Sequence, residues 1–203
     1  MTPRALVTGA GARLGRAMAL SLAQRGHDVA VHFAGSRDGA EATVAEIRAM
    51  GRKAEALQAD LLVEDEAEAL VPRAVAALGG PLTLLVNNAS IFEYDNLETA
   101  TRESWDRHIG SNLRAPFVLT QHFAAQVPEP VQDAAGEPLA SGLIINMIDQ
   151  RVLKLTPERG SNPADITAAL GYFLDAPAVT GQLLCVDAGQ HLAWQTRDVL
   201  GLE

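Results

Sequence analysis

The sequence predicts an α/β fold, a doubly wound parallel sheet forming a single domain over residues 1–203, and three observations support it. First, 203 residues with a hydrophobic fraction of 48% are enough to bury one sizeable core. Second, the short apolar runs are mostly continuous, which is typical of parallel strands covered on both faces. Third, these runs alternate with segments of helical period, and this alternation implies right-handed crossovers within one sheet.

Six apolar runs are the predicted strands, at residues 5–8, 29–33, 54–59, 82–87, 143–148 and 183–187. Two apolar stripes of helical spacing lie between the first three runs, at Leu14, Ala17, Met18 and Leu22 and at Ala40, Val44 and Ile47. Gly26 and Gly51 follow these stripes, where glycine favours the end of a helix.

Prolines mark three further features. Asn162 and Pro163 form an N-cap followed by proline at the first helical position, which predicts a helix over residues 164–174. Pro72 falls inside the otherwise helical stretch 64–78, so we expect a kink or a late helix start there. Residues 127–141 contain three prolines and a glycine, which indicates a surface loop before the fifth strand.

Composition excludes several classes of function. The formal net charge is −9 and no run of five or six Lys or Arg residues occurs, so nucleic-acid binding is disfavoured. No apolar stretch reaches the roughly 18 residues that a membrane-spanning helix needs. The N-terminus leads directly into the first strand without a signal-peptide pattern, which predicts a cytoplasmic protein.

Cysteine and histidine give no sign of a metal site. Cys185 is the single cysteine and stands in an apolar run, so we expect a buried core thiol rather than a nucleophile. The five histidines are far apart and match no metal-ligand spacing, being His27, His32, His108, His122 and His191.

A glycine turn, residues 8–15, follows the first strand and opens a helix. Its glycines, Gly9, Gly11 and Gly15, allow the backbone to approach a pyrophosphate and direct the N–H groups of the helix N-terminus at it. This predicts a Rossmann-type dinucleotide site. The alternative is an ordinary tight turn, which uses the same residues.

The end of the second predicted strand favours NADPH over NADH. An NAD site would place a carboxylate about 20 residues beyond the turn to bind the ribose 2′-hydroxyl. Here Ser36 and Arg37 stand instead, and a hydroxyl with a guanidinium suits a 2′-phosphate. The alternative is that Arg37 is only a solvated loop charge.

Several motifs together resemble the short-chain dehydrogenase/reductase family. In family order they are Thr8-Gly9 to Gly15, Asp60-Leu61, Asn87-Asn88-Ala89-Ser90, Asn112, and the sequence TGQLLCVDAG at 180–189. The resemblance implies that Gly9, Gly11, Leu14, Gly15 and Leu61 contact the cofactor. Asp60 would accept from the adenine amino group, unless it merely caps the next helix. Asn87 and Ala89 would flank the ribose, and Asn112 would be catalytic.

At four further places the sequence is similar to one branch of this family, the pteridine reductases. The matching residues are Arg13, Phe92, Asp149 and the sequence GQHLAW at 189–194. The resemblance implies that Phe92 stacks on a pterin, that Arg13 reaches phosphate and pterin, and that Asp149 bonds the catalytic tyrosine and the substrate. For Phe92 the alternative is ordinary core packing. The resemblance also implies a homotetramer.

The family's Tyr-x-x-x-Lys pair is missing. The two tyrosines are Tyr94 and Tyr172, and neither has a lysine four residues later. The family would place this pair, its helix and a sixth strand just after Asp149, and a crossover helix and strand alone need about 25 residues. We therefore expect a missing segment between about 155 and 158. Either the protein contains it and the sequence omits it, which we favour, or the protein lacks it and would leave a sheet edge exposed.

These residues predict an NADPH-dependent reductase that transfers a hydride to a C=N bond of a dihydropterin or dihydrofolate. A carbonyl or 3-oxoacyl reductase on the same scaffold is an alternative, because a fold fixes the cofactor better than the substrate. A catalytically inactive NADPH-binding protein is a third reading if the Tyr-x-x-x-Lys pair is truly absent.

Overall fold

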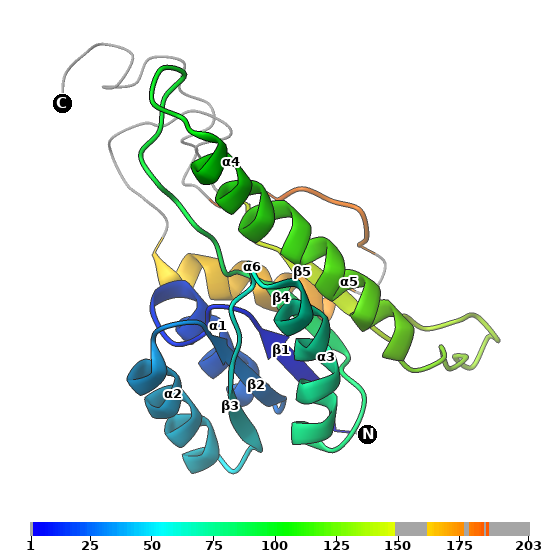
Figure 1. Cartoon of the computed structure of the whole chain (residues 1–203). Helices are drawn as coiled ribbons and strands as arrows, with labels where there is room; N and C mark the ends of the chain where they lie inside the picture. The colour runs from blue at the N-terminus through cyan, green and yellow to red at the C-terminus, as the bar shows by residue number, and fades with distance from the viewer. Residues whose placement is uncertain (1, 149–161, 177–178, 185, 187–203) are drawn as a thin grey trace. The chain divides into compact units, whose positions relative to one another are not determined.

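The computed structural model describes residues 2–148, 162–176, 179–184 and 186 (Figure 1). Its contacts divide the chain into two compact units, Met1–Asn146 and Met147–Glu203. The first unit contains every strand that is assigned among the described residues. Asp149, Cys185 and the sequence GQHLAW lie outside the described residues, and so does Lys154.

The first unit is built on a five-stranded sheet in the order β3-β2-β1-β4-β5, with all neighbouring pairs parallel. The strands are β1 (Arg4–Val7), β2 (Asp28–Phe33), β3 (Ala54–Gln58), β4 (Leu84–Asn87) and β5 (Leu143–Asn146). The chain moves outward from β1 to β3 and then returns to β4 on the other side of β1. The predicted doubly wound α/β sheet is confirmed, and its topological switch point lies between β1 and β4.

Helices connect these strands. They are α1 (Arg13–Gln24), α2 (Arg37–Ala49), α3 (Glu64–Leu78), α4 (Arg102–Ile109), the π-helical turn η1 (Gly110–Arg114) and α5 (Ala115–Gln126). Because β1 to β3 and β3 to β5 run in opposite directions across the sheet, right-handed crossovers place their helices on opposite faces. Accordingly α1 packs with α2, and α3 packs with α5 (Figure 1).

The core of this unit lies between the sheet and the α3–α5 layer. Its largest members are fully or almost fully buried, and they are Leu6, Leu70, Leu78, Leu82, Leu85, Leu119 and Phe123. Burial of a side chain of this size contributes about 2 kcal/mol. All six residues of β2 are buried, which agrees with a continuous apolar run covered on both faces.

Pro72 does not delay the start of α3, which begins at Glu64 and runs through the proline. Pro72 and Glu68 both lie on the exposed face of the helix. Proline has no N–H to donate to the Glu68 carbonyl, but this carbonyl can be hydrated at the exposed face, so the helix tolerates Pro72. Of the two outcomes predicted for Pro72, the late helix start is wrong.

The second unit contains α6 (Pro163–Asp175). The Asn162 side chain accepts hydrogen bonds from the N–H groups of Ala164 and Asp165 at 2.8 and 3.0 Å, so the predicted cap is confirmed. The sixth predicted strand is not found, because residues 182–184 and 186 have no strand assignment. A parallel strand needs a neighbour for its ladder, and the described part of this unit offers none.

Candidate functional site

The glycine turn joins β1 to α1 in a conformation that only some residues tolerate. Gly9 has φ +65° and Arg13 has φ +50°, both in the left-handed region. A Cβ on Gly15 would come within 2.3 Å of the Gly9 carbonyl oxygen. The predicted need for glycine at positions 9 and 15 therefore has a steric cause.

The turn presents backbone donors at the start of α1. Within the part of the chain that the structure describes, the N–H groups of residues 11–15 donate to no acceptor. No side chain caps α1 and no acidic residue occupies its first turn. Unpaired N–H groups and the positive end of the helix dipole together make a site for an anion such as a phosphate.

His32, near the end of β2, holds the glycine turn through two hydrogen bonds. The Gly9 N–H donates to its Nδ1 at 3.1 Å, and the Ala10 N–H donates to its backbone carbonyl at 2.8 Å. Its Nε2 bonds the Ala59 carbonyl at 3.1 Å. Burial of the ring lowers the pKa of His32, because charge is disfavoured away from water. No role for His32 was predicted from the sequence, although a histidine within an otherwise apolar, buried strand indicates a side chain with specific hydrogen-bond partners.

Thr8 and Asn88 tie the turn to the end of β4. The Thr8 hydroxyl accepts from the N–H groups of Asn88 and Ala89, both at 2.9 Å. The Asn88 side-chain amide donates to the Thr8 carbonyl at 2.8 Å. Ala89 abuts the turn, because a Cβ on Gly9 would lie 3.1 Å from the Ala89 Cα. Thr8 and Asn88 were also not assigned a role, although both stand within the motifs quoted from the sequence.

Asn87 carries an oxygen without a partner. The residue is 4% exposed, and its Nδ2 donates to Asn146 Oδ1 at 2.8 Å. Its own Oδ1 is buried with no hydrogen-bond donor among the described residues. An unsatisfied buried oxygen costs about 1–3 kcal/mol, and a hydroxyl of a bound molecule would satisfy it. The geometry thus fits the predicted contact with a ribose.

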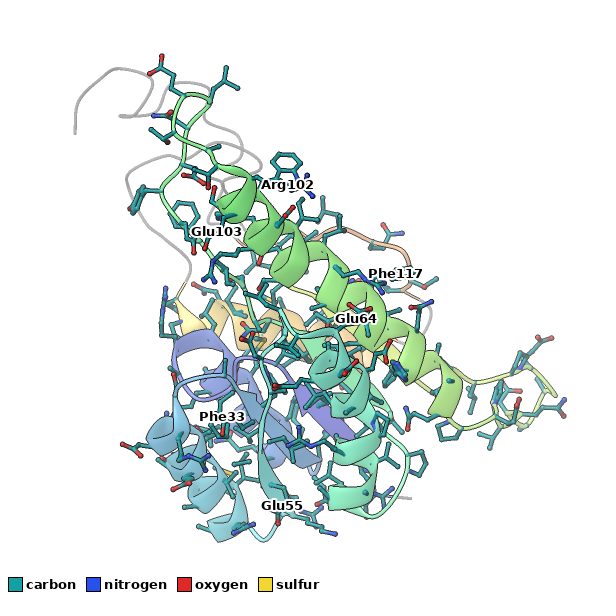
Figure 2. All side chains as sticks on the ribbon, in the orientation of Figure 1. Phe33, Glu55, Glu64, Arg102, Glu103 and Phe117 are labelled. Carbon is teal, nitrogen blue, oxygen red and sulfur yellow. The ribbon has the colours of Figure 1, made fainter. Side chains whose placement is uncertain are left out.

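Ser36 and Arg37 lie beside the turn at the start of α2. A Cβ on Gly11 would come within 2.9 Å of the Ser36 carbonyl oxygen, so the two loops touch. The Arg37 guanidinium donates to Gln58 Oε1 at 2.7 Å and lies 5.3 Å from the centre of the Phe33 ring, which Figure 2 labels. It also pairs with Glu41 at 3.5 Å. Arg37 is therefore held near the mouth of the site and is half-exposed.

A cavity of about 760 Å³ opens at this edge of the sheet. Asp60, Leu62 and Ile91 line it, together with charged side chains from α3 and α4. Asp60 does not cap α3, since its Oδ1 accepts the Leu62 N–H at 3.0 Å. Leu61 packs against the core and is not among the lining residues. A cavity of this size is typical of small-molecule sites.

Asn112 lies in the π-helical turn η1 and holds the 90–97 loop. Its side chain accepts the Ile91 N–H and donates to the Ile91 carbonyl, both at 2.9 Å. Single π-turns within helices are frequent at functional sites. The side-chain amide of Asn112 is thus occupied in positioning the loop that carries Phe92, and its catalytic role stays a prediction.

Phe92 is 53% exposed, so ordinary core packing does not describe it. Its ring meets the Tyr94 ring edge to face at 5.0 Å between centroids. The next residue, Glu93, is bonded to α4: its N–H donates to His108 Nε2 at 3.1 Å and its carboxylate pairs with Arg107 at 2.8 Å. The loop therefore presents an aromatic face to solvent.

No cluster of three or more His, Cys, Asp or Glu side chains with metal-binding geometry was found among the described residues. Among the same residues, no helix combines the length and apolar character required to cross a bilayer.

Comparison with known proteins gives the family. A sequence profile described as short chain dehydrogenase matches residues 3–147. The 3-oxoacyl-(acyl-carrier-protein) reductase FabG of Staphylococcus aureus is 42% identical over 127 residues, which are 63% of this chain and 51% of FabG. An uncharacterized oxidoreductase of Thermotoga maritima is 32% identical over 166 residues, or 82% of this chain and 61% of the relative. The chain thus spans about half the length of the FabG proteins that it matches.

Solved structures include proteins of similar fold that contain a dinucleotide. FolM alternative dihydrofolate reductase 1 from Brucella suis, in complex with NADP, has a TM-score of 0.83 and 30% identity. The match covers 97% of this chain and 98% of the FolM chain. A short chain dehydrogenase from Burkholderia cenocepacia, also in complex with NADP, has a TM-score of 0.66 and 34% identity, with 87% and 69% of the two chains covered.

Proposed function

Because the chain belongs to the short-chain dehydrogenase family, we propose that it binds NADPH at the carboxyl ends of β1 to β4 and acts as an NADPH-dependent reductase. The observation that carries this proposal is the glycine turn with its unpaired N–H groups at residues 11–15. The NADP in the FolM and Burkholderia structures supports the same cofactor.

Each part of the site has a role in holding the dinucleotide. The N–H groups of residues 11–15 bind the pyrophosphate, and the buried Oδ1 of Asn87 accepts from a ribose hydroxyl. Asp60, in the cavity wall, accepts from the adenine amino group. Ser36 and Arg37 bind the 2′-phosphate, for which Arg37 exchanges its bond with Gln58 for a charge-assisted one.

For the substrate we propose a dihydropterin or dihydrofolate. When bound, NADPH supplies the hydride that reduces the C=N bond. Phe92, half-exposed beside the cavity-lining Ile91, offers a flat aromatic face to a pterin ring, which contributes about 1 kcal/mol beyond area burial. Arg13 and Asp149 contact the substrate by resemblance. The FolM similarity over nearly the whole chain supports this substrate class.

A 3-oxoacyl or other carbonyl reductase is the second candidate, and the 42% identity with FabG favours it. A third is an NADPH-binding protein without catalysis, because no tyrosine in the sequence is followed by lysine after three residues. That pair would have supplied the proton that accompanies the hydride.

Two measurements separate the three. NADPH oxidation is followed with dihydrobiopterin, dihydrofolate and a 3-oxoacyl thioester, and the intact mass of the protein is determined. Turnover of the pterins supports the proposal, and turnover of the thioester alone selects the second candidate. NADPH binding without turnover, by a protein whose mass is the 21.5 kDa of this sequence, selects the third.

We also propose that the chain forms a homo-oligomer, a tetramer by family resemblance. An apolar stripe recurs at every fourth residue along α4, η1 and α5, formed by Trp105, Ile109, Leu113 and Phe117, all at least 39% exposed. Contiguous exposed apolar surface of this kind marks protein interfaces. At its α5 end, Arg114 contacts both Phe117 and Glu64, the two residues labelled there in Figure 2.

Sedimentation of Leu113→Lys against Leu97→Lys tests this. Leu97 is fully exposed and lies outside the stripe, so its variant is the control. Only Leu113→Lys should dissociate the assembly. A wild type that sediments as a monomer would contradict the proposal.

A further inference from the structure

His32 is a buried side chain of β2, and each of its two ring nitrogens forms a hydrogen bond with another segment of the chain. It is 1% exposed. Through its Nδ1 it reaches Gly9 at the end of β1, and through its Nε2 it reaches Ala59 just after β3. A single imidazole thus connects the carboxyl ends of three adjacent strands.

The two partners fix the protonation state of the ring. The backbone N–H of Gly9 can only donate, so Nδ1 must accept with its lone pair. The carbonyl of Ala59 can only accept, so Nε2 must carry the hydrogen. The only arrangement that satisfies both is the neutral imidazole with hydrogen on Nε2, because an imidazolium would place two N–H groups against each other at Nδ1.

The bond to Gly9 has consequences along the glycine turn. It holds Gly9 at φ +65°, where the Gly9 carbonyl oxygen packs so closely on Gly15 that a Cβ there would lie 2.3 Å away. Movement of Gly9 therefore displaces Gly15 and the N-terminus of α1. Because Gly9 and Ala10 donate to His32, the first two N–H groups beyond Thr8 are occupied, and those of residues 11–15 remain available.

We propose that His32 is a positioning residue for the phosphate-binding turn, acting as a hydrogen-bond acceptor toward Gly9 in its neutral Nε2–H form. The role rests on the proposed NADPH site and deepens it. His32 does not touch the phosphate. It sets the conformation from which the N–H groups of residues 11–15 bind the phosphate.

Charges around the ring are compatible with this state. Burial lowers the pKa of His32, Arg73 on α3 lowers it further, and the Ala59 carbonyl and Asp60 oppose the change. The ring therefore stays neutral at neutral pH. As the pH falls far enough to protonate it, Nδ1 can no longer accept from Gly9, and NADPH affinity should decrease.

The first test reads the tautomer directly. In long-range ¹H–¹⁵N spectra of the full chain at neutral pH, we expect His32 to show a protonated Nε2 and an unprotonated Nδ1. A protonated Nδ1 would overturn the proposal. This measurement needs no variant and no cofactor, so it decides the point even if NADPH fails to bind.

The second test uses two substitutions, each of which retains one of the two hydrogen-bonding functions of the ring. His32→Asn retains an acceptor near the position of Nδ1, whereas His32→Gln retains a donor near the position of Nε2. We expect NADPH affinity to stay near wild type in His32→Asn and to fall about three- to tenfold in His32→Gln, as for the loss of one hydrogen bond. The decrease of affinity at low pH should persist in neither variant.

The control is His27→Gln, at the opposite end of the strand. His27 is also buried, and its Nδ1 has no hydrogen-bond partner among the described residues. The proposal is overturned if His32→Gln binds as tightly as His27→Gln, or if His32→Asn is the weaker variant. Hydrogen exchange of the Gly9 amide separates this from failure of the proposed function: protection kept in His32→Asn and lost in His32→Gln supports the positioning role whether or not NADPH binds.

Discussion

The glycine turn and the 90–97 loop lie at the same carboxyl edge of the sheet, yet they are held by different kinds of contact. The turn is held at the strand ends by hydrogen bonds of the buried side chains of Thr8 and His32 and of the partly buried Asn88. The loop is held from one side by half-exposed side chains of α4 and η1, namely Asn112, His108 and Arg107. Buried hydrogen bonds without competing water fix a geometry more firmly than exposed ones. The turn is therefore preorganised for the proposed cofactor, and the loop that we propose contacts the substrate is held less firmly.

The largest expected effect comes from crowding the turn. Gly15→Ala places a Cβ against the Gly9 carbonyl, and overpacking of a closely packed site costs about 1–3 kcal/mol. We expect calorimetric titration to show NADPH affinity reduced about tenfold to a hundredfold. Gly35→Ala is the matched control, because its Cβ would meet nothing within 4 Å. Unchanged affinity in Gly15→Ala would mean that the turn does not bind the cofactor.

The next effect concerns cofactor choice. Arg37→Ala removes a cation beside the expected 2′-phosphate, and a hydrogen bond to a charged group contributes about 1.5–3 kcal/mol. Affinity for NADPH should fall at least about tenfold, while affinity for NADH should not change. Arg102→Ala, which makes the same charge change on α4, is the control. An NADPH affinity equal to that of the control would leave Arg37 as a solvated loop charge.

A smaller effect, confined to the substrate, is expected at the 90–97 loop. Phe92→Ala removes an aromatic face that is 53% exposed, so the free energy of unfolding should change by less than about 0.5 kcal/mol. KM for a dihydropterin should rise about fivefold, as for the loss of about 1 kcal/mol of stacking. NADPH affinity should match wild type. Reduced NADPH affinity would show that the two borders of the site are not independent.

The last expected effect is a dependence of stability on pH, which leaves both borders of the site unchanged at neutral pH. Burial lowers the pKa of both His27 and His32, so the unfolded chain binds more protons than the folded one once the pH falls below about 6.5. The free energy of unfolding should therefore be level above this pH and decrease below it, by at most about 1.4 kcal/mol per pH unit for each histidine. Urea titrations across the pH range measure this slope. A slope that persists in His27→Gln combined with His32→Asn would assign it to other groups.

The sheet and the turn were predictable because local patterns determine them. Continuous apolar runs mark buried parallel strands, and Gly9 and Gly15 are required by φ and by close contact, so both features can be read from neighbouring residues. The cap at Asn162 was predictable for the same reason. Pro72 was harder, because whether a helix tolerates proline depends on which face meets water.

The residues that hold the site together were less accessible to sequence reasoning. His32 bonds partners 23 and 27 positions away, and Thr8 bonds Asn88 and Ala89 across 80 and 81 positions. Such pairs depend on which strands become neighbours, and a single sequence does not state this. Leu61, which the family resemblance places at the cofactor, packs against the core, and its contact with the cofactor stays a prediction. The roles of Asp149 and Asn112 stay predictions.

The central claim is that the glycine turn binds the phosphates of NADPH, and a ¹H–¹⁵N titration of the full chain tests it most directly. The account predicts that NADPH saturably shifts the amide signals of residues 11–15, with NADH binding more weakly, while the loop at 127–141 is unaffected. Saturable NADPH binding that leaves the amides of residues 11–15 unmoved, or no binding at all, would contradict it.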